Sequence, residues 1–271
     1  MKYRLSQKNK GLPKHQKKST INLFFFYLLT LLVCCTEQNS LSNEIVIINA
    51  SYLDRNDIGK IINHSTQAKV IGINFLFRKQ MDDDSLFLTA VEKYKDKLIF
   101  TIGFDNCQPD PDTLYCDLIN NFFSFLSINE GFSTLSYSTM ITTKGVRTTK
   151  EKIMYSFIRM DDNQSYPHFG LAVANLYEDL PLDIIRSKKA YEVIELQYPQ
   201  DAFELIEGKD LLNNPEKYQH LFKDKIVLIG YLGKEIGYIP LDPIIEEDYS
   251  AAHQLYQTII IANQICNILE N

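Results

Sequence analysis

Six residues of the chain could contact a small polar ligand, because each stands at or just past the end of an apolar run of strand length. They are Asn49, Ser51, Asn74, Asp105, Gly230 and Tyr231. Together they offer amide, hydroxyl and carboxylate groups beside an aromatic ring, which is enough to orient a small polar molecule. The alternative is that Asn49 and Asn74 only hydrogen-bond to neighbouring loops. A shared pocket requires that the Asn74 and Tyr231 side chains face one cavity rather than opposite faces of a sheet.

The sequence predicts no catalytic residue, no metal and no cofactor. It lacks the Gly-x-Ser-x-Gly turn of one hydrolase class, and Gly230 to Gly233 lacks the Lys-Ser/Thr of a phosphate-binding loop. No two of its five His stand four residues apart, so a helix-borne zinc site is not expected. Asp82-Asp83-Asp84 is interpreted as a solvated helix start rather than a cation site. An unrecognised hydrolase is a minor alternative that requires a base and a nucleophile in one cleft.

Three cysteines lie in the body of the chain, and two of them are close in sequence. Cys107 and Cys116 stand nine residues apart around Pro109 and Pro111. In an oxidising compartment they could form a disulfide that closes a short loop, and free thiols are the equal alternative. Cys266 is expected to be a small buried hydrophobe on the last helix.

The N-terminus has the pattern of a targeting signal. Seven Lys or Arg precede an apolar core over residues 21–33, which is too short for an ordinary bilayer-spanning helix but suits a signal peptide. Cys34 and Cys35 follow directly, and Leu32-Val33-Cys34-Cys35 resembles a bacterial lipobox with Cys35, or else Cys34, as the lipidated residue. We therefore expect a signal or membrane anchor over 1–35, a linker over 36–43 and a domain over 44–271. An uncleaved anchor and an ordinary signal peptide are alternatives, and all three place the body outside the cytoplasm.

The charge is distributed unevenly along the chain. The first 35 residues carry no acid, so the remainder carries 21 basic and 34 acidic residues, a net charge of −13. An acidic body repels phosphate backbones, so nucleic-acid binding is not expected.

The body alternates between continuous apolar runs and amphipathic segments. Strands are predicted over 44–49, 69–76, 97–102 and 226–230, with helices over 54–64 and from Asp82 onward. Continuous apolar strands separated by helices predict an α/β fold, a single domain with a mostly parallel sheet covered by helices on both faces. Further on, we expect a loop over 106–112, a strand pair around a turn at 142–147 and helices over 168–177 and 251–269. In such sheets ligands bind beyond the carboxyl ends of the strands, which is where the six residues stand.

Several segments, in this order, resemble the second class of cyclase- and histidine-kinase-associated sensory extracellular (CHASE) domain. They are Val70 to Phe77, Gly145-Val146-Arg147, Phe169 to Ala174, Phe222 to Gly233 and Leu255 to Ile265. The resemblance implies a sensory domain over about residues 44–270. The chain departs from the family pattern at Asn74, where an Asp is common, and at Gln257 and Ile261, where the closing helix usually has Gly and His.

The resemblance implies a non-catalytic, extracytoplasmic sensor or ligand-binding module tethered to a bacterial membrane. Family members usually continue into membrane helices and an output domain, whereas the sequence here stops at Asn271. We therefore expect the sensory domain alone. Its partner would be a small ligand or a protein of the cell envelope, such as a membrane signalling protein. The alternative is an adaptor that binds an envelope protein without a small ligand.

Overall fold

The computed structural model describes a body that begins near residue 40. The described residues are 40–82, 84–109, 114–119, 121–126, 128–133, 136–142, 145–155, 157–159, 165–181, 191–193, 197–232 and 257–270. The chain divides into two compact units, residues 1–40 and 41–271, and the account below concerns the second. The predictions for the apolar core, Cys34 and Cys35 lie outside the described residues. Within the described part, no helix combines the length and the apolar character that a membrane crossing requires.

Six parallel strands form the centre of the main sheet, in the order β11-β1-β12-β2-β3-β5. Their bounds are β1 Ile45–Asn49, β2 Val70–Ile73, β3 Leu98–Pro109, β5 Asn129–Phe132, β11 Glu204–Glu207 and β12 Ile226–Gly230. The predicted α/β fold with a mostly parallel sheet is confirmed. Strand β12 is inserted between β1 and β2, although it comes more than 150 residues later in the chain.

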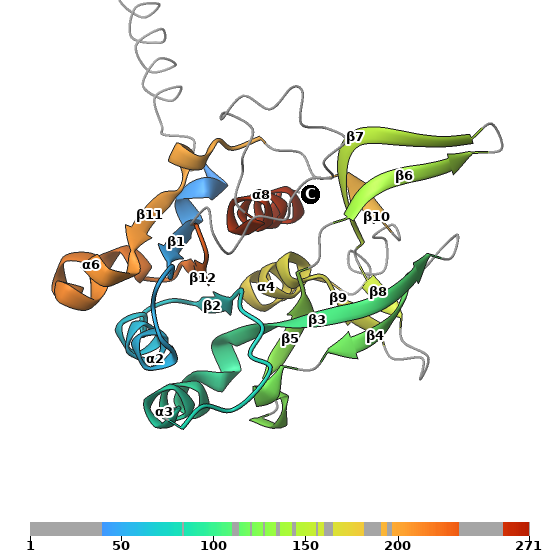
Figure 1. Cartoon of the computed structure of the whole chain (residues 1–271). Helices are drawn as coiled ribbons and strands as arrows, with labels where there is room; N and C mark the ends of the chain where they lie inside the picture. Colours follow the sequence, from blue (N-terminus) through green and yellow to red (C-terminus); the bar gives the residue numbers. More distant parts are fainter. Residues whose placement is uncertain are drawn as a thin grey trace, which may run out of the picture. The chain divides into compact units, whose positions relative to one another are not determined.

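Strand β3 runs on past its parallel neighbours and continues as one arm of an antiparallel hairpin (Figure 1). Its partner is β4 (Leu114–Ile119), and two short strands complete this part of the sheet, β8 (Phe157–Arg159) and β9 (Ser165–Pro167). The loop predicted over 106–112 is therefore wrong for residues 106–109, which belong to β3. The predicted strand pair is present as β6 (Ser136–Thr142) and β7 (Gly145–Tyr155), which form a three-stranded sheet with β10 (Tyr191–Val193). The turn predicted over 142–147 is too long, because residues 142 and 145–147 belong to these strands.

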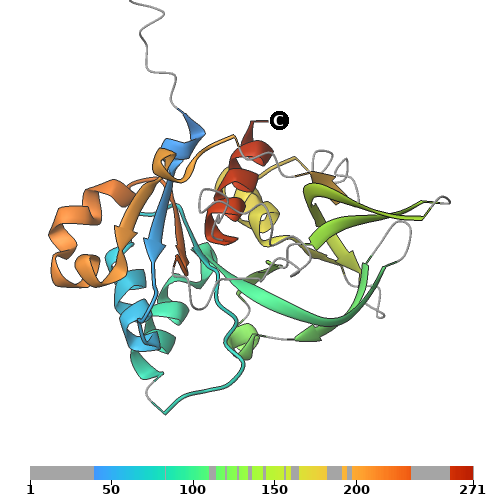
Figure 2. The same ribbon diagram turned by 45° about the horizontal axis from the view of Figure 1, so that its top comes forward.

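Helices cover both faces of the parallel strands (Figures 1 and 2). On one face lie α2 (Arg55–His64), α3 (Ser85–Tyr94) and α6 (Gly208–Asn213), and on the other lie α4 (Phe169–Glu178) and α8 (Gln257–Leu269). The shorter helical segments are η1 Leu41–Glu44, η2 Lys95–Lys97, η3 Phe122–Leu126, η4 Gln200–Ala202, α7 Pro215–Tyr218 and η5 Gln219–Phe222. The helices thus complete a three-layer arrangement around the sheet.

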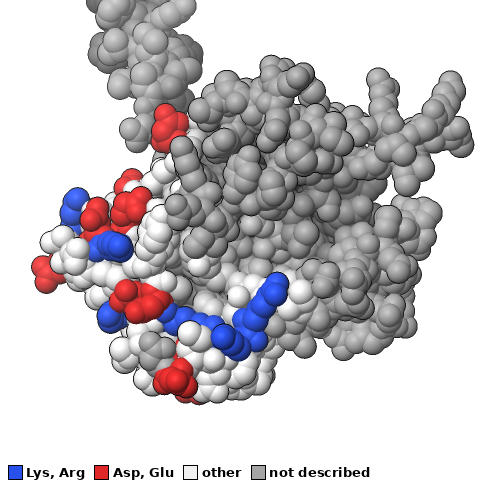
Figure 3. All heavy atoms as spheres, viewed as in Figure 1, with Lys and Arg blue, Asp and Glu red and all other residues white. Residues whose placement is uncertain are grey.

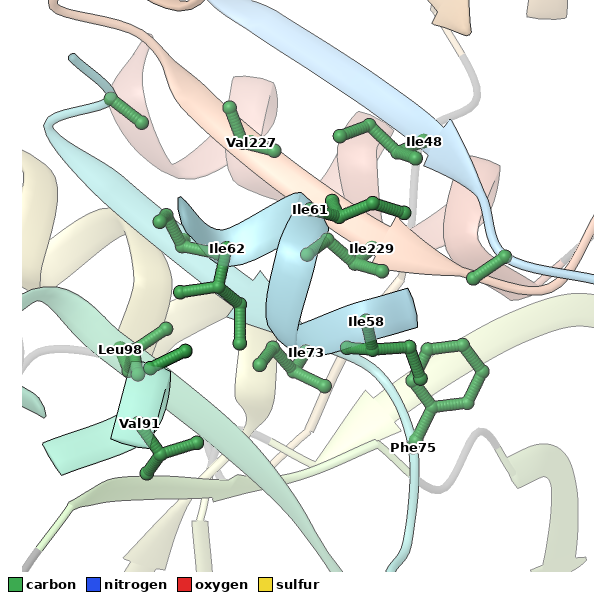
Figure 4. Packing of buried hydrophobic residues seen from close by; sticks show 14 of the residues in the cluster. Ile48, Ile58, Ile61, Ile62, Ile73, Phe75, Val91, Leu98, Val227 and Ile229 are labelled. Atoms are coloured by element: carbon green, nitrogen blue, oxygen red, sulfur yellow. The ribbon is translucent and has the colours of Figure 1, made fainter. Parts of the chain in front are cut away.

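Strand β12 is buried on both faces, as its sequence predicts. Val227 and Ile229 pack with the α2 and α3 side of the core, while Ile226 and Leu228 pack with the α4 and α8 side. All four have no exposed surface. Figure 4 shows the first of these clusters, in which side chains of α2 lie over Ile48, Ile73 and Ile229. Full burial of each such side chain contributes roughly 1.5–3 kcal/mol, so the central strands supply much of the driving force for folding.

Local signals fix where two helices begin. Asp54 precedes α2 as its N-cap, and its carboxylate accepts a hydrogen bond from Asp57 N at 2.7 Å. His168 precedes α4, and its Nδ1 accepts from Gly170 N at 3.2 Å. Helix α3 buries Phe87 completely, while the neighbouring Leu86 is 52% exposed. Close approach to α2 sets this face, because a Cβ at Gly59 would lie 2.9 Å from Phe87 Cα.

Candidate functional site

The carboxyl end of β12 lies between strands whose following helices cover one face and a helix, α8, that covers the other. Its neighbours β1 and β2 lead into α2 and α3 on one face, whereas the next described helix after β12 is α8 on the opposite face. In open α/β sheets, ligands bind outside the carboxyl ends of the strands, near the point where neighbouring strands are followed by helices on opposite faces. The candidate site is therefore centred on Gly230, the last residue of β12.

Five residues at neighbouring register positions form a row across this edge of the sheet, which we call the terminal row. It consists of Glu207 (β11), Asn49 (β1), Gly230 (β12), Asn74 (after β2) and Thr101 (β3). The register pairs Glu207 with Asn49 and Asn49 with Gly230. The pairing of Ile229 with Ile73 places Asn74 beside Gly230. Three predicted site residues, Asn49, Asn74 and Gly230, are thus brought together, although they come from distant parts of the chain.

Side-chain alternation turns the terminal row toward the α4 and α8 face. Ile47 and Leu228, two residues before Asn49 and Gly230, both pack in the α4 and α8 core cluster. Gly72, two residues before Asn74, lies against Phe169 of α4. Because side chains alternate between faces along a strand, Asn49, Gly230 and Asn74 share this face.

Asn49 ties together the ends of three strands. Its Nδ2 donates to the Glu207 carboxylate at 3.0 and 3.2 Å. Its Oδ1 accepts from Ser51 N at 3.1 Å, from Ser51 Oγ at 2.7 Å and from Leu232 N at 3.1 Å. Ser51, another predicted site residue, is thus part of the same network. The side chain of Asn49 is fully engaged within the protein, as the alternative interpretation expected.

Asn74 uses only one end of its amide within the described residues. Its Oδ1 accepts from Thr101 Oγ1 at 3.1 Å. The Thr101 carbonyl in turn accepts from Asn121 Nδ2 at 3.1 Å, which links the row to the segment before η3. Asn74 is half-buried, and none of the described residues accepts a hydrogen bond from its Nδ2. That N–H group is therefore a donor left over for a ligand or for water.

Helix α8 lies directly against the centre of the row. A Cβ at Gly230 would collide with the side chain of Thr258, so glycine is required for this close approach. Thr258 Oγ1 also donates to the Tyr231 carbonyl at 3.4 Å. A hydroxyl from α8 therefore stands at the gap that glycine leaves between Asn49 and Asn74.

Two predicted site residues lie apart from the terminal row. Tyr231 belongs to the α2 and α3 face, where its ring meets Phe75 edge-on at 4.4 Å between centroids. Its burial raises the pKa of its hydroxyl. Asp105 lies beyond the parallel part of β3, in the antiparallel hairpin opposite Asp117. Asn74 and Tyr231 thus point to opposite faces of the sheet and do not share one pocket.

An exposed aromatic residue that the sequence did not single out lies next to the row. Tyr52 is 70% exposed and has φ 66°, a left-handed conformation that is unusual for a bulky residue. The Lys209 ammonium lies over its ring at 5.7 Å. Strained, exposed residues cluster at functional sites, so Tyr52 extends the candidate site at its outer rim.

Among the described residues, which leave out Asp83 of the acidic helix start, no group of three potential metal ligands gathers. Asp84 is not solvated as predicted, because it is 1% exposed and pairs with Arg55 at 2.7 Å. Figure 3 shows Lys/Arg and Asp/Glu interspersed over the described surface that faces the viewer. This mixed surface gives no electrostatic footprint for a nucleic acid there.

Helix α8, which contains most of the Leu255 to Ile265 motif, holds a neighbouring segment in place. Asn263 is fully buried on α8, and its Oδ1 accepts from Tyr198 N at 2.8 Å. Its Nδ2 donates to Tyr198 O at 3.0 Å and to Ile259 O at 3.1 Å. Asn263 therefore joins the segment before η4 to helix α8.

Comparison with known proteins gives one finding. The family model of the CHASE2 domain matches residues 24–271, nearly the whole chain. No curated protein and no solved structure matches. The match extends over all the described strands and helices, and it agrees with the order of motifs in the sequence. The chain therefore belongs to the CHASE2 domain family.

Proposed function

We propose that this chain is a non-catalytic, extracytoplasmic sensor module, tethered to a membrane through its N-terminus, that binds a small polar ligand at the terminal row. CHASE2 domains are sensory extracellular domains, and a sensory domain implies a ligand or a signalling partner. The observation that carries the ligand proposal is the Asn74 Nδ2 beside Gly230, from which no described residue accepts a hydrogen bond. The site would recognise its ligand through amide and hydroxyl groups, which suits an acceptor-rich polar molecule.

Thermal unfolding with a panel of free amino acids, dicarboxylates and monosaccharides tests the site. A solute present at about 100 times its Kd stabilises the protein by about 2.7 kcal/mol, which raises the Tm by several degrees. Asn74→Ala removes one hydrogen bond, so we expect about tenfold weaker binding with the fold retained. The measurement is the Kd from the concentration dependence of the Tm.

Tyr231→Ala is the matched control, since Tyr231 lies at the same edge of the sheet but on the other face. A ligand held by the terminal row should bind this variant with unchanged affinity. Equal weakening by both changes would instead indicate a pocket that reaches both faces. Unchanged affinity in Asn74→Ala would contradict the proposed role of its amide.

The second candidate function is an adaptor that binds an envelope protein without a small ligand. Two observations favour it: Asn49 has no unused polar atom, and the exposed Tyr52 offers an aromatic contact at the rim. The adaptor function is supported if no solute shifts the Tm and if Tyr52→Ala abolishes cross-linking to an envelope protein.

The proposed tether rests on the apolar core that ends at Cys34 and Cys35. In a bacterial host we expect the full chain in the membrane fraction, and Cys35→Ala, combined if necessary with Cys34→Ala, should move it to the soluble fraction. Cys266→Ala, which leaves the N-terminus intact, should remain with the membrane. Retention of the double variant would show an uncleaved anchor in place of a lipid.

A further inference from the structure

The β3–β4 hairpin places two cysteines within the same interruption of its register. Asp105 pairs with Asp117, and the next pair is Gln108 with Tyr115. Between these two pairs, β3 has two residues, Asn106 and Cys107, whereas β4 has only Cys116. Two residues against one is the arrangement of a β-bulge. Cys107 and Cys116 therefore meet in one bulge, where Asn106 and Cys107 together lie opposite Cys116, although the sequence around Pro109 suggested a loop.

We propose that Cys107 and Cys116 form a disulfide that closes this hairpin across its bulge. Opposed residues of an antiparallel pair have their Cα atoms about 4.5–5.5 Å apart, within the range of roughly 4.4–6.8 Å that a disulfide spans. Membership of a family of extracellular domains supplies the compartment in which disulfides persist. The proposal concerns the fold of the hairpin and holds with or without a ligand at the terminal row.

The third cysteine of the body is not a competing partner. Cys266 lies within α8 and is fully buried in the α4 and α8 core cluster. Burial raises the pKa of its thiol to about 12, so it does not form the thiolate that disulfide exchange requires. Among the cysteines of the body, Cys107 and Cys116 are therefore the two that can react with each other.

The bond forms by thiol–disulfide exchange with an external disulfide. One cysteine thiolate attacks the donor disulfide and displaces a thiolate, and the second cysteine then attacks the mixed disulfide and displaces the other. The two cysteines lose two protons and two electrons, and the donor disulfide is reduced to two thiols. The closed bond pins the register at the point where the bulge interrupts pairing, and so stabilises the extension of β3.

Peptide mapping of the full chain tests the bond. The chain is purified without reductant from an extracytoplasmic compartment, its free thiols are alkylated in denaturant, and it is digested at aspartates. Asp110 and Asp112 lie between the two cysteines, so the digest separates them unless a disulfide joins them. We expect a linked Cys107–Cys116 peptide pair that disappears on reduction, and the same pair in the Cys266→Ser control. In Cys116→Ser, Cys107 should be fully alkylated.

Oxidation of the purified protein in a redox buffer distinguishes a host that fails to form the bond from a protein that cannot form it. Reduced, folded protein in a glutathione buffer of extracytoplasmic potential should form the same linked pair as the main product. Glutathione adducts on both cysteines, or linkage of Cys107 to another cysteine, would overturn the proposal. So would full alkylation of both cysteines after this treatment.

Discussion

Replacing Arg55 by Met should lower the free energy of unfolding by about 3–5 kcal/mol, the range found when one partner of a buried ion pair is removed. Arg55 Nη1 lies 2.7 Å from Asp84 Oδ2, and the two side chains are 16% and 1% exposed. The guanidinium also lies over Phe77 at 5.0 Å and Phe123 at 5.6 Å. Without it, the Met81 N–H, at 2.8 Å, is the one hydrogen-bond donor that the described residues would still offer to the Asp84 carboxylate. Urea titration at pH 7 measures the loss.

The charge and the aromatic contacts can be separated by a second variant. Arg55→Met combined with Asp84→Asn removes the unpaired charge while keeping an acceptor for Met81 N. This double variant should recover a large part of the loss, because a neutral amide is far less costly to bury than a carboxylate. Equal losses in the single and double variants would show that aromatic packing, not charge, is the main contribution. Lys60→Met is the matched control, since Lys60 pairs with Asp57 at 2.8 Å on the surface and should hardly matter.

The parallel core of the domain could be predicted from the sequence because burial on both faces leaves a continuous apolar run. This was so for β1, β2, β12 and the first half of β3, and Asp54 marked the start of α2. Strand β11 was missed for the opposite reason. It is an edge strand in which only Ile206 is buried and Glu204 and Glu207 are exposed, so it has no apolar run. Charged residues on an edge protect it against pairing with another chain, and they also hide it from a search for apolar runs.

The second half of β3 was missed because its structure comes from a partner strand. Residues 106–109 contain a proline and polar residues, which is typical of a loop, yet they pair with β4. Pro109 stands at the last position of the strand, where a missing N–H is tolerated. Pairing between segments is a tertiary interaction, and local residue preferences do not report it.

The candidate site could be predicted only in its chemistry. The sequence identified Asn49, Asn74 and Gly230 as residues past strand ends, but their adjacency depends on the insertion of β12 between β1 and β2. Glu207 and Thr258 were missed, because one follows an unpredicted strand and the other enters the site from α8. The alternation of side chains between the two faces of a strand did predict one feature of the site. Tyr231 follows Gly230 directly, so the two had to point to opposite faces.

Acid should destabilise the protein through His168, by about 3 kcal/mol between pH 7 and pH 4. The imidazole is fully buried at the start of α4, and Phe132 meets it edge-on at 4.9 Å. Its Nδ1 accepts from Gly170 N, so the ring is neutral, and burial lowers its pKa to about 3 against a slight opposing effect of Gln264. The unfolded chain takes up this proton near pH 6.5, whereas the native state does not until about pH 3. The contribution of the neutral His168 to stability is therefore complete above pH 6.5. It falls by about 1.4 kcal/mol per pH unit between pH 6.5 and about pH 3.

His168→Asn isolates this contribution, because Asn caps a helix N-terminus well and does not titrate. The variant should be less stable at pH 7, since a smaller side chain leaves space beside Phe132. Its unfolding free energy, measured in urea at pH 7 and pH 4, should nevertheless fall by about 3 kcal/mol less than that of the wild type. His220→Asn changes an exposed histidine and should leave the pH profile as it is. Parallel profiles for wild type and His168→Asn would mean that buried carboxylates, and not this imidazole, account for the sensitivity to acid.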